Sequence, residues 1–437
     1  MIIAAFLNIT LTNFVMNRNS GDITPSGIQY PDKQTRLFRL VAADVTIAGM
    51  IAADSWLRTS LIRHWRWYLR LGIAWFVISQ LGAIGPRAPL GPQQVVNTQH
   101  PIVCVHTRLI DEVWEWKIQR TLQLVREMGA DTIVEFFPWA YIESTQDYYD
   151  WEPADRIIRH AENQGLKVIA RMGLVPGWAR PRDSTLNYLP ENAFDELAAF
   201  VADFAARYAG VVDHIIIWNE PNLAFEWGYR PIDPAAYARL LEAVYAPAHA
   251  ANPDVVILAA GLAPTLEPEG SPNGLNDILY LEQLYQAGGG NFFDALAVHT
   301  YGFTEPPEAE PAFDRLNFRR AELLHEIMTH YEAGDKPVFI TETGWNDHPR
   351  WTKAVRPAQR IQYTLDAFRY VEANWPWLEK LCLWAFRYPA PTYSYPDNFE
   401  IVTSDFQIRP IYYAIQDYAL HREGNTDLWL PAPEPAS

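Results

Sequence analysis

The sequence has 437 residues, of which 49% are hydrophobic and 14% are aromatic, so it can bury one large core with extensions and is not a disordered chain. Its net charge of −17 leaves no basic excess to neutralise phosphates, which excludes nucleic-acid binding as the main function. The chain is rich in aromatic residues, with 17 Trp and 22 Tyr, which suits sugar-binding clefts, although most aromatic residues pack in cores and at their rims.

The N-terminal part differs in charge from the rest: residues 1–86 carry eight Lys and Arg against four Asp, which leaves −21 for the remainder. Four arginines, at positions 58, 63, 66 and 70, precede the uncharged run 71–85, and the last three stand in "RHWRWYLRLGIAWFVISQLGAIGP". This run is short for a spanning helix of about 20 residues and fits the apolar core of an export signal better. A translation start at Met50 would place that signal at the usual short distance from the N-terminus. Residues 1–49 therefore fit a start codon assigned too far upstream.

We therefore expect an N-terminal extension, residues 1–98, that carries a signal or membrane anchor and a linker, and an extracytoplasmic protein that is secreted or membrane-anchored. The alternative is a buried or amphipathic helix that packs on the main domain. Cys104 and Cys382 are the only cysteines, which argues against a disulfide scaffold or a cysteine metal cluster. Both lie in apolar strand-like runs, where buried thiols are common.

From residue 99 onward, short apolar runs alternate with segments of helical period. The runs are 102–105, 132–137, 167–172, 214–219, 255–260, 293–299, 338–341 and 381–386. Helical segments between them include "KIQRTLQLVREMGA", "ENAFDELAAFVADFAARYAG" and "PAQRIQYTLDAFRYVEAN", and several close on Gly, as a helix C-cap does. Eight strand–helix units predict an α/β fold, a (β/α)8 TIM barrel over residues 99–422, followed by a C-terminal tail, 423–437. A doubly wound open sheet is the alternative, but "CVHTRLIDEVWEW" after the first strand is no Gly-rich phosphate loop.

Chemistry in such a barrel gathers at the C-terminal ends of the strands. Two of these ends carry glutamates: Glu220 in "IIIWNEPNL" after the fourth strand and Glu342 in "ITETGW" on the seventh. Strands four and seven face each other across the mouth of the barrel. Two carboxylates in one pocket can divide their roles, because the like charge of one raises the pKa of the other. Glycoside hydrolysis uses such a pair of carboxyl groups. A pair about 5–5.5 Å apart retains the configuration at the anomeric carbon, and a wider pair inverts it.

The residues around the pair fit the same chemistry. Asn219 precedes the first acid and can hydrogen-bond the sugar hydroxyl next to the reacting carbon. Three tryptophans at strand ends offer faces on which the C–H side of a pyranose could stack, namely Trp384, Trp139 and Trp345.

The motifs "WNEPN" and "ITETGW", with "HTY" between them, resemble those of the clan A retaining glycoside hydrolases, and the cellulase-like and β-xylosidase-like families in particular. The resemblance covers roughly residues 100–420. It implies that Glu220 is the acid/base, Glu342 the nucleophile, Asn219 the ligand of the 2-hydroxyl and Tyr301 a hydrogen-bond partner of the nucleophile. It also implies that His299 and Trp384 line the reacting subsite, with a non-proline cis peptide after Trp384.

Two positions depart from the cellulase-like pattern, which has an Arg at the second strand end and a His at the third. Here those ends read Phe-Pro-Trp and Arg171, so these motifs do not determine which sugar is the substrate. Arg171 is either a substrate ligand or a structural partner of Glu220 or Asp183. His299 is either a site residue or a buried histidine bonded to a carbonyl. No dense set of metal ligands is present in the sequence, and the chemistry needs neither metal nor other cofactor.

The sequence thus predicts a glycosidase that cleaves β-glycosidic bonds of polysaccharides or oligosaccharides through two glutamates, with carbohydrate as its partner and possible membrane attachment through residues 71–85. Two other functions fit the same fold. A non-catalytic carbohydrate-binding envelope protein would normally have lost one acid, and this chain has both. A transglycosylase would use the same residues and pass the glycosyl unit to a sugar in place of water.

Overall fold

The computed structural model describes residues 65, 67, 70 and 88–420. The chain divides into two units, Met1–Gly85 and Pro86–Ser437, and the second contains the domain described below. The expected apolar segment 71–85 and the tail 423–437 lie outside the described residues. Among the residues that are described, no helix is both long and apolar enough to span a membrane.

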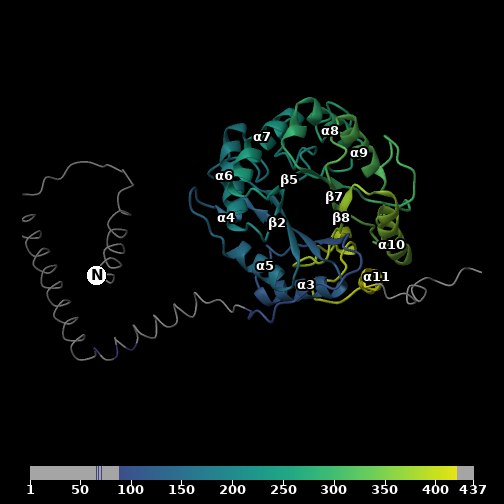
Figure 1. The fold of residues 1–437 in the computed structure, drawn as a ribbon, viewed down its shortest axis with the longest axis horizontal. Helices are drawn as coiled ribbons and strands as arrows, with labels where there is room; N and C mark the ends of the chain where they lie inside the picture. Colours follow the sequence, from purple (N-terminus) through teal and green to yellow (C-terminus); the bar gives the residue numbers. More distant parts are fainter. Residues whose placement is uncertain (1–64, 66, 68–69, 71–87, 421–437) are drawn as a thin grey trace, which may run out of the picture. The chain divides into compact units, whose positions relative to one another are not determined.

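Eight parallel strands close into a barrel in the order of the sequence, β1 to β8, with β8 paired to β1 (Figure 1). The strands are β1 Val103–His106, β2 Thr132–Pro138, β3 Lys167–Gly173, β4 His214–Ile217, β5 Val256–Ala259, β6 Ala295–His299, β7 Val338–Thr343 and β8 Leu378–Leu383. The predicted (β/α)8 TIM barrel is therefore confirmed. All eight predicted runs overlap a strand, and the last strand begins and ends three residues earlier than predicted.

Helices surround the barrel and connect its strands (Figure 1). They are α3 Glu115–Met128, α4 Trp139–Ile142, α5 Glu152–Asn163, α6 Phe194–Arg207, α7 Pro234–Ala251, α8 Asp277–Gln286, α9 Arg320–His330, α10 Pro357–Asn374 and α11 Pro410–Ala419, with short 3-10 helices η2 Glu191–Ala193, η3 Gly289–Asn291 and η4 Tyr395–Asn398. Local chemistry sets their ends: α3 stops at Gly129 with φ 91°, and α7 starts where the Asp233 side chain accepts from the Ala236 N–H.

Strand alternation divides the core in two. One face of each strand packs against the helices, where the larger apolar cluster lies. The other face points into the barrel, where a smaller cluster of buried residues contains Cys104, Val134, Ile169, Ile216, Leu258, Ala297, Phe339 and Cys382. The barrel interior is therefore a filled core below the level of the strand ends.

The two cysteines are bonded to each other, which corrects the expectation of two buried thiols. Cys104 of β1 and Cys382 of β8 are register partners, fully buried, and form a disulfide across the seam at which the barrel closes. They are 278 residues apart in sequence, so only closure of the barrel brings them together. Their burial in apolar strands is as expected.

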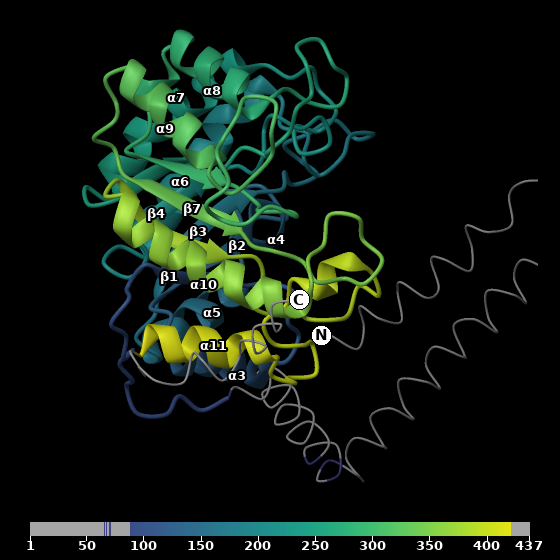
Figure 2. The same cartoon turned by 90° about the vertical axis from the view of Figure 1, so that its right-hand side faces the viewer.

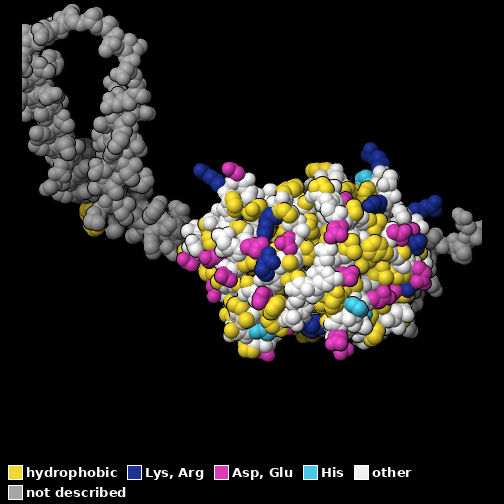
Figure 3. Space-filling model, turned by 90° about the horizontal axis from the view of Figure 1, so that it is seen from above, with side chains coloured by type: hydrophobic (Ala, Val, Ile, Leu, Met, Phe, Trp, Pro, Cys, Tyr) yellow, Lys and Arg dark blue, Asp and Glu magenta, His cyan; other side chains and the backbone are white. Residues whose placement is uncertain are grey.

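The loops that follow the strands rise together from one end of the barrel, as the side view shows (Figure 2). Lys and Arg side chains on the face seen in Figure 3 are scattered among acidic and apolar ones and do not gather into a basic surface. The site described next lies at the end of the barrel from which the strand-to-helix loops leave.

Candidate active site

The inward face of the barrel continues upward from its apolar core into a polar layer. Two residues beyond each core position, alternation points the next side chain inward. This layer contains His106, Phe136, Arg171, Trp218, His299 and Trp384. A single period-two rule thus carries six side chains of four kinds to the mouth of the barrel.

Glu342 reaches this layer through an irregularity of β7. Phe339 points inward, so simple alternation would turn Thr341 inward next. The pairing of β6 with β7 shifts by one residue after Val298, and His299 lies opposite Glu342. An extra residue of this kind is a β-bulge, which redirects a side chain, and here it aims the glutamate into the barrel.

Glu220 stands on strained backbone just beyond the end of β4. Trp218 has φ 80° and Glu220 has φ 41°, values that cost residues other than glycine about 1–3 kcal/mol each. The Glu220 N–H donates to the Gly261 carbonyl at 3.0 Å, which holds this turn against the end of β5. Strain held in this way at a carboxylate is typical of functional sites.

The two glutamates meet around His299. A carboxylate oxygen of Glu220, a ring nitrogen of His299 and a carboxylate oxygen of Glu342 all lie within 4.8 Å of one another. His299 Nδ1 is 2.9 Å from Glu220 Oε1 and 3.8 Å from Glu342 Oε2. Burial on its own would lower the pKa of His299, but the carboxylates of Glu342 and Glu220 outweigh it and raise that pKa. A protonated imidazole between the two acids reduces their mutual repulsion.

Further donors fix Glu342. The Tyr301 hydroxyl donates to its Oε2 at 2.9 Å, and Arg171 Nη1 donates to its Oε1 at 3.3 Å. His106 Nε2 lies 3.7 Å from the same Oε1. Burial and the nearby Arg171 hold the pKa of His106 well below its ordinary value, so this ring is neutral. Glu342 is therefore held in one orientation by the Tyr301 phenol and the Arg171 guanidinium, while the His106 Nε2 beside it has no hydrogen-bond partner among the described residues.

Asn219 is linked to the same network, since Arg171 Nη1 also donates to its Oδ1. This contact assigns the amide: its oxygen faces Arg171, and its Nδ2 is left to donate elsewhere. Arg171 was expected to be either a substrate ligand or a structural partner of Glu220 or Asp183. In the structure its side chain contacts Glu342 and Asn219 instead of those two acids.

Most of the residues predicted from the sequence gather at this site. The structure brings together Glu220, Glu342, Asn219, His299, Tyr301, Arg171 and Trp384. Trp384 is partly exposed, packs its edge against His106 at 4.5 Å between ring centroids, and is followed by the expected cis peptide to Ala385. The donor atoms of Glu220, His299 and Glu342 are also of the kind that binds divalent cations, but each is engaged by the hydrogen bonds described above.

Three tryptophans were predicted to stack on a sugar ring, and for two of them, Trp139 and Trp345, the prediction is wrong because both are buried. Trp139 is fully buried, and its Nε1 donates to Glu143 at 2.7 Å while its ring packs on Phe200. The strand-end residue of β2 that faces the site is Phe136, three positions earlier, as alternation from Val134 requires. Trp345 is 1% exposed and packs on Phe318 behind the site.

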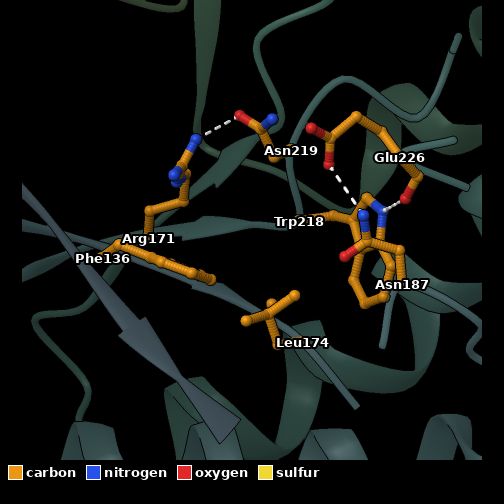
Figure 4. A pocket seen from close by; sticks show the side chains of 8 residues that line it. Phe136, Arg171, Leu174, Asn187, Trp218, Asn219 and Glu226 are labelled. Atoms are coloured by element: carbon orange, nitrogen blue, oxygen red, sulfur yellow. Dashed lines mark hydrogen bonds between the residues drawn. The ribbon is translucent and has the colours of Figure 1, made fainter. Parts of the chain in front are cut away.

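A third carboxylate of the site, Glu226, was not predicted. Glu226 lies in the loop after β4. Its side chain lines a pocket together with those of Phe136, Arg171 and Asn219 (Figure 4). Burial raises the pKa of Glu226 to about 7, and the neighbouring Glu220 contributes to the rise. The only signal in the sequence is its place six residues after Glu220, which is too weak to single it out from an exposed loop acid.

The family model of the glycosyl hydrolase catalytic core matches residues 188–393, a stretch that contains both Glu220 and Glu342. No curated protein matches the sequence.

Solved structures of the same fold include a family 39 glycoside hydrolase from the gut symbiont Bacteroides cellulosilyticus WH2, with 22% identity and a TM-score of 0.60, over 76% of this chain and 66% of that one. A monomeric β-xylosidase from Caulobacter crescentus CB15 has 18% identity and a TM-score of 0.54, over 74% of this chain and 69% of that one. A GH5_18 protein from Streptomyces cattleya, solved in complex with GlcNAc, has 17% identity and a TM-score of 0.54, over 77% and 83%.

At these identities the structural likeness shows the fold, and the chain spans just under two thirds of the first of these proteins. The chain is thus a TIM barrel whose residues 188–393 are similar to the glycosyl hydrolase catalytic core.

Proposed function

We propose that the protein is a retaining β-glycosidase that hydrolyses β-linked polysaccharides or oligosaccharides by double displacement. The observation that carries the proposal is the closeness of the two acids, with oxygens of Glu220 and Glu342 within 4.8 Å of each other. Retaining enzymes hold their carboxyl groups about 5–5.5 Å apart, whereas inverting enzymes leave room for a water at about 6.5–9.5 Å.

In the first step, Glu342 attacks the anomeric carbon while Glu220 donates its proton to the departing glycosidic oxygen. The C–O bond to the leaving group breaks and an ester to Glu342 forms. The contacts from Tyr301 and Arg171 suit this role, because they keep the carboxylate oriented for attack.

In the second step, Glu220 takes a proton from water, and the resulting oxygen nucleophile attacks the anomeric carbon and releases Glu342. His299 contacts Glu220 directly and can help to orient it in both steps. Asn219 accepts from Arg171 through its Oδ1, and its Nδ2, which faces Glu226, can also donate to the sugar hydroxyl beside the reacting carbon.

The proposal is tested with Glu342→Ala and Glu220→Ala on a panel of aryl β-glycosides and β-linked oligosaccharides, with and without azide. The panel begins with β-xylosides, since one protein of the same fold is a β-xylosidase. We expect Glu342→Ala to lose hydrolysis by at least about 10⁴-fold, and Glu220→Ala to regain turnover of activated glycosides with azide. Glu326→Ala, an exposed glutamate on α9, is the matched control. Undiminished hydrolysis by Glu342→Ala would rule the assignment out.

We also propose that the protein acts outside the cytoplasm. The arginine-flanked apolar run 71–85 supports export, and the Cys104–Cys382 disulfide fits an oxidising compartment. Fractionation of cells that express the full chain tests this: enzyme found only in the cytosol, with both thiols reduced, would contradict it.

A further inference from the structure

Beside the two catalytic candidates lies a pocket that shares Arg171 and Asn219 with the site, and whose Glu226 and Asn187 have no part in the double displacement. It has a volume of about 150 Å³ and opens between the ends of β2, β3 and β4 and the loops that follow them (Figure 4). Its apolar walls are Phe136, Leu174 and Trp218, and its polar groups include Asn187, Asn219 and Glu226. Apolar walls with a few converging polar groups are the usual composition of a ligand site.

The protein holds Glu226 in this pocket through both its backbone and its side chain. Trp218 is 2% exposed, and its Nε1 donates to the Glu226 carbonyl at 2.9 Å. Asn187 Nδ2 donates to the Glu226 carboxylate at 3.3 Å, while the carboxylate turns toward Asn219 in Figure 4. The loop after β4 thus presents this acid to the pocket in a defined orientation.

The pocket adjoins the reacting centre through Asn219, which also lines it. Asn219 is the proposed ligand of the hydroxyl next to the reacting carbon, so the pocket faces that side of the reacting sugar. Its volume is several times the ~30 Å³ that one water occupies in the liquid. A single hydroxyl would leave most of it empty, whereas a group of the size of a sugar ring would fill it.

Its charge selects against anions. Glu226 stands beside Glu220 and Glu342, and the cationic groups that face them are Arg171 and His299. Arg171 is already engaged by Glu342 and Asn219. The pKa of Glu226, raised by burial to about 7, allows its carboxyl group to donate as well as accept near neutral pH, which suits hydroxyl groups.

We propose that this pocket is a second sugar-binding position, that it takes a neutral, hydroxyl-bearing glycosyl unit attached to the reacting sugar on its Asn219 side, and that Glu226 is its specificity-determining residue. The inference rests on the proposed function and narrows its substrate class to neutral oligosaccharides.

The test compares kcat/KM for an oligosaccharide series of increasing length with kcat/KM for the aryl monoglycoside of the same sugar, which cannot fill the pocket. For Glu226→Ala, which removes the carboxyl group, we expect the ratio of oligosaccharide to monoglycoside to fall by about tenfold or more, the value of one or two lost hydrogen bonds. Glu226→Gln, whose amide also donates and accepts, should lower the ratio less. Asn187→Ala, which removes the partner of Glu226, should lower the ratio less. Asp183→Asn, an exposed acid of the loop after β3, should leave it unchanged.

A second comparison uses an oligosaccharide whose non-reacting unit is a uronic acid. We expect the wild type to discriminate against it and Glu226→Gln to discriminate less, because a negative charge is removed from the pocket. Thermal unfolding of each variant checks that it folds. An unchanged ratio in Glu226→Ala, or an equal loss on both substrate types, would overturn the second position while the monoglycoside activity still supports the proposed function. Absence of hydrolysis by the wild type on the whole panel would overturn the proposed function itself.

Discussion

We predict that substitution of Gly261 by alanine displaces residues of the site and lowers kcat. Gly261 follows β5, and its carbonyl accepts the N–H of Glu220 at 3.0 Å. A Cβ added at this position would lie 2.3 Å from Cδ2 of His299 and 2.5 Å from its Nε2. Since carbon atoms in contact lie about 3.5–4.0 Å apart, the imidazole or the Glu220 turn must move by roughly 1 Å.

His299 has little room in which to move, because it is 3% exposed. A shift of that size breaks its 2.9 Å contact with Glu220. Misplacement by about 1 Å costs enzymes about 10²-fold in rate, and overpacking costs about 1–3 kcal/mol in unfolding free energy. We therefore expect Gly261→Ala to fold with reduced stability and to lose about a hundredfold in kcat.

The assay is the hydrolysis of an activated aryl β-glycoside, with the free energy of unfolding measured by denaturant titration. Gly177→Ala is the matched control, since no heavy atom lies within 4 Å of a Cβ added there. Its kcat and stability should match the wild type. Gly261→Ala with wild-type kcat and wild-type stability would refute the inference that close packing of His299 under Gly261 positions the acids.

Three further predictions concern the site and the barrel seam. Arg171→Met removes a donor from Glu342 and should lower kcat/KM about a hundredfold, with a smaller loss in Arg171→Lys; steady-state kinetics with wild-type KM and kcat in both variants would contradict this. Reduction of the disulfide between Cys104 and Cys382 should cost about 2–5 kcal/mol of unfolding free energy, measured with and without reductant; free thiols in the denatured, unreduced protein would show that the bond is absent. The raised pKa of His299 stabilises the fold below the ordinary value of 6.5, and this contribution is lost as pH rises through the raised value. The stability difference between wild type and His299→Gln should therefore be larger at about pH 6 than at about pH 9, and the opposite order would contradict the assigned charge.

The sequence predicted the features that depend on local pattern. Alternating runs and helical segments identified the barrel, and the ends of β4 and β7 identified Glu220 and Glu342, because parallel strands carry their C-terminal residues to one rim. Tyr301, His299 and Trp384 followed from the resemblance of the motifs to a known clan.

Other features depend on register and closure, which the sequence pattern does not contain. Trp139 was misread because the inward residue of β2 is Phe136, which only the phase of the strand decides. The bulge that turns Glu342 inward has no local signal. Cys104 and Cys382 meet only because β8 pairs with β1. Glu226 is brought to the site by the path of a loop, which Trp218 and Asn187 hold in place.

The most direct test of the two-glutamate mechanism is to trap the covalent intermediate. An activated 2-deoxy-2-fluoro β-glycoside slows both displacement steps, so the glycosyl–enzyme ester accumulates. Tandem mass spectrometry of the digested protein should then locate one sugar on the peptide that contains Glu342, with no label in Glu342→Ala. A sugar attached to any other residue, or turnover through an inverted product with no covalent adduct, would contradict the assignment.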